Sequence, residues 1–274
     1  MRRDVEEVEM RLLLEGIEQV YGYDFRDYAE ASITRRLTHW LAESDFDTFS
    51  LAQSRVLRDR EVFDSLLRGI TINVTEMFRD PAFFRTIREQ IVPFLKTYPF
   101  VKIWHAGCAT GEEAYSMAIL LNEEGLAGRY RIYATDINET ILERAREGIL
   151  SVAEMQQFTR NYQLSGGAAS FADYYTARYE YAILDPTLRK DIVFAPHNLA
   201  TDGVFGEMNM ILCRNVMIYF KPALKERCLQ LFDRSLPAGG FLCLGLKEAL
   251  DRRSIEPQYE ELEGQMRIYR KRYG

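Results

Sequence analysis

The stretch KIWHAGCATGEEAYSMAILL, from Lys102 to Leu121, decides the expected fold. A short apolar run comes first, a turn bounded by Gly107 and Gly111 follows, and an amphipathic run completes it. That order predicts a strand, a loop and a helix, the unit that holds nucleotides in α/β proteins. Glu112 and Glu113 come directly after the loop, where they would repel a pyrophosphate bound to the same amides. The loop therefore suits an adenosine-containing ligand that is cationic and lacks phosphate, although a plain tight turn has the same spacing.

Asp136 ends the next apolar run, YRIYATD. An acidic residue at the tip of the second strand is placed to accept hydrogen bonds from both ribose hydroxyls. It can also cap the following helix, NETILERAREGI. Taken together, the loop and the acid predict an adenosine-binding site. The missing GxGxxG and the paired glutamates favour S-adenosylmethionine over NAD.

The chain divides into two regions that differ in the spacing of their apolar residues. Residues 1–71 carry apolar side chains at helical spacing, which predicts an all-helical domain. Residues 72–90 form a linker, and residues 91–274 alternate short apolar runs with helical segments, which predicts an α/β domain with a mostly parallel sheet. The tyrosine-rich stretch at about 161–190 predicts a small inserted β unit. The final run, QMRIYRKR, predicts an antiparallel edge strand.

Bulk composition excludes several classes of protein. The net charge of −6 argues against nucleic acid as the partner, because phosphate binding leaves a basic footprint. No run reaches the roughly 18 apolar residues that a membrane span needs. The cysteines and histidines form no metal-binding cluster, so we expect no metal. We expect a soluble, cytoplasmic monomer with buried free thiols.

Five motifs lie in the order and spacing of CheR-type methyltransferases, which the chain resembles over nearly its whole length: ITINVTEMFRD, GCATGEEAYSMA, ATDINETILERAREGI, FAPHNLA and CRNVMIYF. The resemblance implies a Rossmann-like class I methyltransferase sheet with an inserted small β subdomain, preceded by an all-helical N-terminal domain. It implies that S-adenosylmethionine methylates glutamate side chains of bacterial chemoreceptors, with S-adenosylhomocysteine as the product. The partners would be the cytoplasmic methylation helices of those receptors.

The resemblance also implies roles for individual residues. Cofactor contacts are implied for Asn73, Thr75, Arg79, Glu113, Asp136, Asn198, Leu199, Asn215 and Val216. Within this set, Glu113 matches the acid near the methionine amino group and Asp136 the ribose acid. Arg79 and Tyr219 match the positions that orient the substrate glutamate. From the residues alone, Arg79 can equally be a surface arginine of the linker, and Tyr219 a strand-end tyrosine with a solvated hydroxyl.

The expected chemistry needs no general base. A glutamate with a pKa of about 4.3 is already ionised at neutral pH, so the protein has to supply alignment and exclusion of water. We expect Arg79 to steer the incoming carboxylate without clamping it, and the Tyr219 hydroxyl to donate a hydrogen bond near the methyl group. In SITRRLTHWL, the basic residues Arg35, Arg36 and His39 form either a solvated face or, by the resemblance, a face that meets the acidic receptor helices.

The resemblance thins at two places. Receptor-tethered members hold a C-terminal pentapeptide by strand addition beside a glycine-rich turn. The corresponding stretch here, YEYAILDPTLRKDIVF, has no such glycines, which argues against pentapeptide tethering. In LGLKEAL, Lys247 replaces a small polar residue close to the site. Two other interpretations stay open: a methyltransferase-fold protein with another acceptor, and a cofactor-binding signalling adaptor with little turnover.

Overall fold

The computed structural model describes residues 2–71, 75–250 and 258–273. The N-terminal domain is helical, as expected, with α1 (Arg2–Tyr21), α2 (Glu30–Glu43), α3 (Phe49–Val56) and α4 (Arg60–Ile70). Helix α1 stops before Gly22, whose φ of 77° is one that glycine adopts without strain. The apolar faces of these helices pack into a core of their own, separate from the sheet.

The segment 81–95 is helical. It holds α5 (Pro81–Thr86), a π-helical segment (Ile87–Ile91) and α6 (Val92–Leu95). The expected linker, 72–90, therefore contains α5 and most of the π-helical segment. Phe83 and Phe84 are fully buried in the core of the α/β domain, so this segment is packed against that domain.

The α/β domain is built on a sheet with the order β6-β2-β1-β7-β8-β10-β9 among the described residues. Its strands are β1 (Val101–Ala106), β2 (Tyr130–Asp136), β6 (Ile192–Pro196), β7 (Met210–Cys213), β8 (Phe241–Leu244), β9 (Tyr259–Glu263) and β10 (Ile268–Lys271). The pairs from β6 to β8 are parallel, and β10 is antiparallel to both neighbours. This confirms the predicted Rossmann-like sheet. The final strand, β10, is antiparallel, as predicted. It is not the edge strand, because β9 lies outside it, and the charged sequence of β9 was not recognised as a strand.

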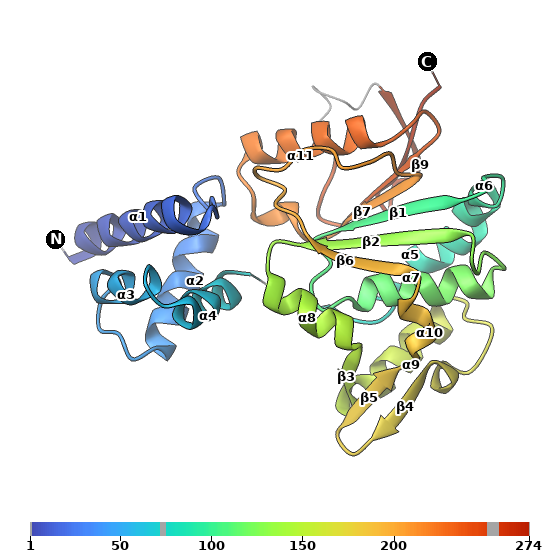
Figure 1. Ribbon diagram of the computed structural model, residues 1–274. Coiled ribbons are helices and arrows are strands. Elements are labelled where there is room, and N and C mark those ends of the chain that lie inside the picture. Colours follow the sequence, from blue (N-terminus) through green and yellow to red (C-terminus); the bar gives the residue numbers. More distant parts are fainter. Residues whose placement is uncertain (1, 72–74, 251–257, 274) are drawn as a thin grey trace.

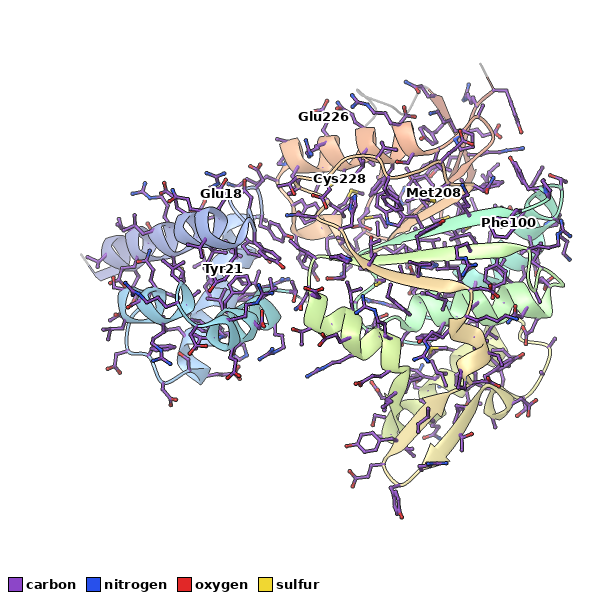
Figure 2. All side chains as sticks on the ribbon, in the orientation of Figure 1. Glu18, Tyr21, Phe100, Met208, Glu226 and Cys228 are labelled. Atoms are coloured by element: carbon purple, nitrogen blue, oxygen red, sulfur yellow. The ribbon has the colours of Figure 1, made fainter. Side chains whose placement is uncertain are left out.

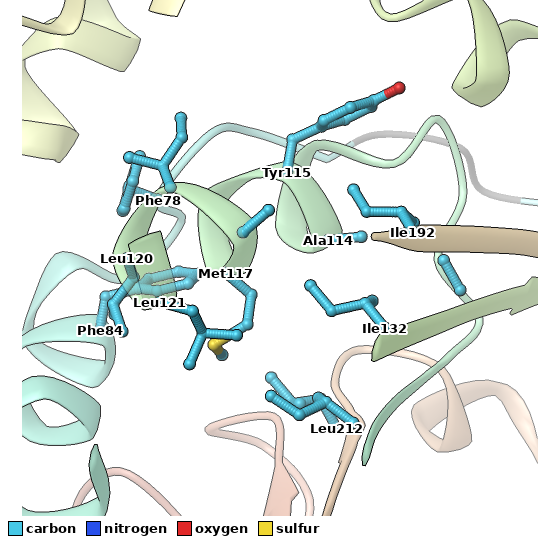
Figure 3. Close-up of a cluster of buried hydrophobic side chains, with 14 of the residues drawn as sticks. Phe78, Phe84, Ala114, Tyr115, Met117, Leu120, Leu121, Ile132, Ile192 and Leu212 are labelled. Carbon is cyan, nitrogen blue, oxygen red and sulfur yellow. The ribbon is translucent and has the colours of Figure 1, made fainter. Parts of the chain in front are cut away.

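Helices cover both faces of this sheet (Figure 1). Helices α7 (Glu112–Glu123) and α8 (Glu139–Glu147) lie on one face, and α11 (Pro222–Ser235) lies on the other. Figure 3 shows side chains of α7, among them Met117 and Leu121, against Ile132 and Leu212 of the sheet. On the opposite face, α11 and the sheet form a second hydrophobic core, in which Cys228 of α11 is fully buried (Figure 2).

A small antiparallel sheet, with the order β3-β5-β4, is inserted between β2 and β6. It consists of β3 (Ile149–Ser151), β4 (Tyr175–Arg178) and β5 (Tyr181–Leu184). Around it lie α9 (Met155–Leu164), α10 (Pro186–Arg189) and the 3₁₀ turns Val152–Glu154 and Phe171–Tyr174. The expected range, 161–190, holds β4 and β5. The strand β3 precedes that range, because the chain enters the small sheet directly after Gly148 ends α8.

The helical domain is joined to the α/β domain through backbone contacts. The Ala29 amide donates to the Tyr219 carbonyl at 2.7 Å, and the Lys221 amide donates to the Asp27 carbonyl at 2.7 Å. The Tyr28 and Phe220 rings meet edge to face at 4.9 Å. These contacts place the start of α2 beside the 3₁₀ turn Met217–Tyr219.

Candidate active site

A cavity of about 350 Å³ lies at the carboxyl ends of β1, β2 and β7. This is the point where the strand order reverses, and ligands of open α/β sheets bind there. The cavity brings together Thr75, Arg79, Glu113, Asp136, Asn198, Leu199, Asn215, Val216 and Tyr219. All of these were expected from the sequence to lie at one site. The remaining member of the predicted set, Asn73, lies outside the described residues.

The loop after β1 is locked to the end of β2. The amides of Gly107 and Cys108 both donate to the Thr135 carbonyl at 2.8 Å. Gly107 has a φ of 82°, and a Cβ on it would lie 2.5 Å from a methyl carbon of Val216. Only glycine allows both the backbone conformation and this close approach. The loop therefore forms a cradle of bare backbone beside Val216.

Asp136 is buried at the tip of β2. Its Oδ1 accepts from the Asn138 amide and its Oδ2 accepts from the Ala109 amide, each at 3.0 Å. Burial raises the pKa of Asp136, and these backbone hydrogen bonds oppose the rise. The cap of α8 is Asn138, whose Oδ1 accepts from the Ile141 amide, so the capping alternative for Asp136 is wrong. Each oxygen of Asp136 keeps acceptor capacity for a ribose hydroxyl.

Glu113 belongs to a buried cluster of charges. Its Oε2 accepts from Nη1 of Arg214 at 2.8 Å, and its Oε1 lies 2.9 Å from Nδ1 of His105. Burial disfavours the carboxylate, but Arg214 and His105 outweigh this and lower the pKa of Glu113 to about 2. Because Glu113 is ionised, Nδ1 of His105 is the donor. Arg214 also donates to Asp80 at 2.7 Å, so two carboxylates share one guanidinium.

The two adjacent glutamates have opposite environments. Glu112 is also buried, but its carboxylate accepts from Thr110 Oγ1 at 2.7 Å and does not line the cavity. Burial raises the pKa of Glu112 to about 7, and the hydrogen bond from Thr110 opposes the rise. Of the two adjacent glutamates, only Glu113 therefore contributes a negative charge to the cavity.

The chain after β7 turns sharply into the cavity and is held by Glu248. Asn215 has a φ of 63°, a left-handed conformation that asparagine tolerates better than most residues. One oxygen of Glu248 accepts from the amides of Asn215 and Gly245, at 2.9 and 2.7 Å, and the other accepts from the Ile218 amide at 3.1 Å. This buried carboxylate fixes the backbone that carries Val216 and Tyr219.

Asn198 shapes the loop that brings Leu199 to the cavity. Its Oδ1 accepts from the Ala200 amide at 2.9 Å, and its own amide donates to Asp202 at 2.8 Å. These bonds within the loop direct Leu199 toward the cavity and the core behind it. The side-chain oxygen of Asn198 therefore fixes the backbone of this loop.

Several lining or supporting residues were not predicted. Arg214 follows the apolar run of β7, and Glu248 lies just after β8, so a charged residue at a strand end was the available signal for both. The sequence predicts one basic face that holds Arg35, Arg36 and His39. Arg35 and His39 are exposed, whereas Arg36 is buried and lines the cavity, with its guanidinium 4.3 Å from the centre of the Tyr219 ring. The expected basic face therefore lacks Arg36.

Three features of this cavity fit S-adenosylmethionine. The bare backbone at Gly107 leaves room for close approach, Asp136 presents a buried carboxylate to ribose hydroxyls, and the ionised Glu113 suits a cationic amino acid portion. Among the described residues, no group of three His, Cys, Asp or Glu side chains could hold a metal ion. Within the same ranges, the helices lack the length and hydropathy of a membrane span.

The strand order and the cavity at its switch point define a Rossmann-like methyltransferase of class I. The chain matches the family model described as CheR methyltransferase, SAM binding domain, over residues 73–267. It matches the model described as CheR methyltransferase, all-alpha domain, over residues 9–71. The chain therefore belongs to the CheR family of S-adenosylmethionine-dependent methyltransferases.

Similar proteins cover almost the whole chain. A protein of Pseudomonas putida named "Putative methyltransferase Cher3" is 51% identical over 97% of this chain and 97% of its own length. A chemotaxis protein methyltransferase of Listeria monocytogenes is 31% identical over 84% of this chain and 85% of its own length. One of Salmonella typhimurium is 28% identical over 90% of this chain and 85% of its own length.

The contrast between the two glutamates predicts opposite effects on stability. The pKa of Glu112 in the folded protein, about 7, lies above the usual carboxyl value of 4.5, so its contribution to stability is lost as the pH rises between these values. Glu112→Gln should raise the free energy of unfolding by roughly 1–3 kcal/mol at pH 8 and change it little at pH 5. Urea denaturation at both pH values measures this.

Glu113→Gln is the matched control. Its carboxylate is ionised at both pH values and paired with Arg214, so this variant should lose stability at pH 5 and pH 8 alike. A Glu112→Gln variant less stable than the wild type at pH 8 would contradict the assignment.

Proposed function

We propose that the protein transfers a methyl group from S-adenosylmethionine to glutamate side chains of bacterial chemoreceptors, giving glutamate methyl esters and S-adenosylhomocysteine. The observation that carries the proposal is that Arg36, Arg79 and Lys247 line the cavity together with Tyr219, in addition to Arg214, which is paired with two carboxylates. These cations suit an anionic acceptor. The names of the relatives from Listeria and Salmonella, chemotaxis protein methyltransferases, support a chemoreceptor as the source of that anion.

The chemistry of a carboxylate acceptor matches what the cavity offers. S-adenosylmethionine, when bound, supplies a methyl group on a sulfonium. An ionised glutamate needs no base, whereas a hydroxyl or ammonium acceptor must first lose a proton. Arg79 attracts and orients the carboxylate, and the Tyr219 hydroxyl donates a hydrogen bond close to the transferred methyl. Glu248 keeps Tyr219 in place by holding the backbone before it.

We infer that the receptor is engaged without a pentapeptide clamp. The strands β4 and β5 are joined through Tyr179 and Glu180, and no glycine lies in that turn. Tyr179 is fully exposed at its tip. This supports recognition through the methylation helices themselves, with the exposed Arg35 and His39 as candidates for contact.

The direct test is incubation of the protein with receptor-rich membranes and methyl-tritiated S-adenosylmethionine. Glutamate esters release tritiated methanol in base, and the labelled residue can be mapped. Label that resists base would point to another acceptor. Binding of the cofactor in calorimetry without transfer to any receptor would point to a signalling adaptor.

Arg79→Ala should abolish transfer and spare the cofactor. We expect cofactor affinity to stay within about tenfold, or ~1.4 kcal/mol, because Arg79 acts mainly on the acceptor. Calorimetry and methanol release measure the two effects separately. Arg160→Ala, at an exposed position on α9, is the charge-matched control. Unimpaired turnover in the Arg79 variant would remove this residue from the mechanism.

Asp136→Ala should act first on cofactor binding. The substitution removes the carboxylate that faces the ribose and leaves the Ala109 and Asn138 amides without their acceptor. We expect affinity for S-adenosylhomocysteine to fall by more than about tenfold. Asp45→Ala, in an exposed loop of the helical domain, is the control. Unchanged affinity in the Asp136 variant would refute its ribose role.

A further inference from the structure

A tight turn after β8 carries a lysine to the rim of the cavity. Leu246 and Lys247 are the two central residues of this turn, which is closed by the Glu248 amide donating to the Gly245 carbonyl at 2.8 Å. Lys247 lines the cavity and is exposed to solvent. Leu246, the preceding residue, is exposed as well. The turn therefore presents one cation and one apolar side chain outside the protein core.

The base of this turn is fixed to the chain that carries Tyr219. The Gly245 amide donates to the same Glu248 oxygen as the Asn215 amide. A Cβ on Gly245 would lie 2.6 Å from that oxygen and 2.7 Å from the amide nitrogen of Asn215, so only glycine leaves space for this contact. Because the two segments share one buried carboxylate, the backbone of Lys247 is held at a set position relative to Tyr219.

Lys247 has no counter-ion within the described ranges. Arg214, which also lines the cavity, pairs with Glu113 and Asp80, whereas no described carboxylate forms an ion pair with Lys247. An exposed ammonium is stable in water without such a partner. It is therefore the place of Lys247 on the cavity wall, and not an unmet bond, that points to a ligand.

The number and exposure of the cations indicate what Lys247 binds. One carboxylate that enters the cavity brings a single negative charge, and Arg36 and Arg79 already supply two positive ones. Arg36 is buried, whereas Lys247 is exposed and faces the segment that carries the acceptor. It suits a second anionic side chain that stays outside. The ammonium of lysine is a point charge on a flexible stem, which accepts an anion over a range of geometries.

We propose that Lys247 is a specificity-determining residue that binds a second acidic side chain, one that flanks the glutamate to be methylated in the same peptide. Leu246 packs against an apolar side chain of that peptide. This inference rests on the proposed function and narrows its acceptor to segments with two neighbouring acidic residues. Because the ion pair is exposed, it contributes a preference of about threefold, which salt weakens.

Short helical peptides test this preference by fluorescence anisotropy, with the protein saturated with S-adenosylhomocysteine. One set of alanine-rich peptides carries an acceptor glutamate and a second glutamate one, three or four residues away. The matched peptide carries its second glutamate two residues away, which keeps the net charge and turns it to the opposite side of the helix. At low ionic strength the wild type should bind at least one peptide of the first set about threefold more tightly than the matched peptide.

Variants of Lys247 assign the preference to this residue. Lys247→Met should bind both kinds of peptide with equal affinity. Lys247→Glu should reverse the preference and favour peptides with lysine in the second position. Lys190→Met, at an exposed position just before β6, removes the same charge at the opposite end of the strands and should keep the threefold preference.

A receptor fragment that the wild type methylates gives a second readout. Replacing the flanking acidic residue of the fragment by glutamine should raise KM about threefold for the wild type. The same replacement should leave the KM of Lys247→Met unchanged, because that variant has already lost the contact.

Two results would overturn the inference: a wild type with no preference at any spacing, or a Lys247→Met variant with the same preference as the wild type. If Lys247→Met fails to fold, Lys247→Ser decides by the same comparison. A preference that depends on Lys247, in a wild type that methylates no receptor, would reject the proposed function and leave this recognition site standing. Methylation of receptor glutamates without any such preference would reject only the role of Lys247.

Discussion

The site depends on one buried guanidinium shared by two carboxylates. Arg214, at the end of β7, binds Glu113 at the start of α7 and Asp80 just before α5. Its guanidinium also lies 3.9 Å from the centre of the Phe83 ring. Three segments far apart in the sequence are thereby drawn to one edge of the sheet. Removing one partner of a buried ion pair is strongly destabilising, so this cluster fixes the segment that contains Asp80. Arg79 is the preceding residue and is thereby kept close to the cavity.

The cavity is lined by charges of both signs. Glu113 and Asp136 line it at the start of α7 and the end of β2, and Arg36 and Arg79 line it together with Tyr219. A cationic donor and an anionic acceptor therefore both find side chains of opposite charge in the same space. Since the two reacting groups have opposite charge, their approach is favoured once water is excluded.

Sequence patterns predicted the layered α/β fold well, because a central parallel sheet requires uninterrupted apolar runs such as MILC and FLCL. They also indicated Asp136, which ends a strand, and Glu113, which lies at the start of a helix. They missed β9, where Tyr259 is buried but its neighbours are glutamates exposed at the sheet edge. They placed Arg36 on an exposed basic face, either solvated or in contact with the receptor, because helical spacing cannot show that another domain packs against that turn.

Glu248 illustrates the same limit in the site. Its partners are backbone amides of Asn215 and Ile218, roughly 30 residues earlier in the chain. Backbone donors leave no mark in the sequence, so a carboxylate that organises a loop resembles any polar residue after a strand. No sequence pattern indicated that Arg214 binds two carboxylates, since Glu113 and Asp80 come close to it only when α5 and α7 pack on the sheet.

A crystal structure of the complex with S-adenosylhomocysteine tests the central claim most directly. The account predicts ribose hydroxyls within about 3.2 Å of the Asp136 carboxylate, the amino group beside Glu113, and the sulfur directed toward Tyr219. A ligand bound elsewhere, or one lying in this cavity with its sulfur turned away from Tyr219, would contradict it.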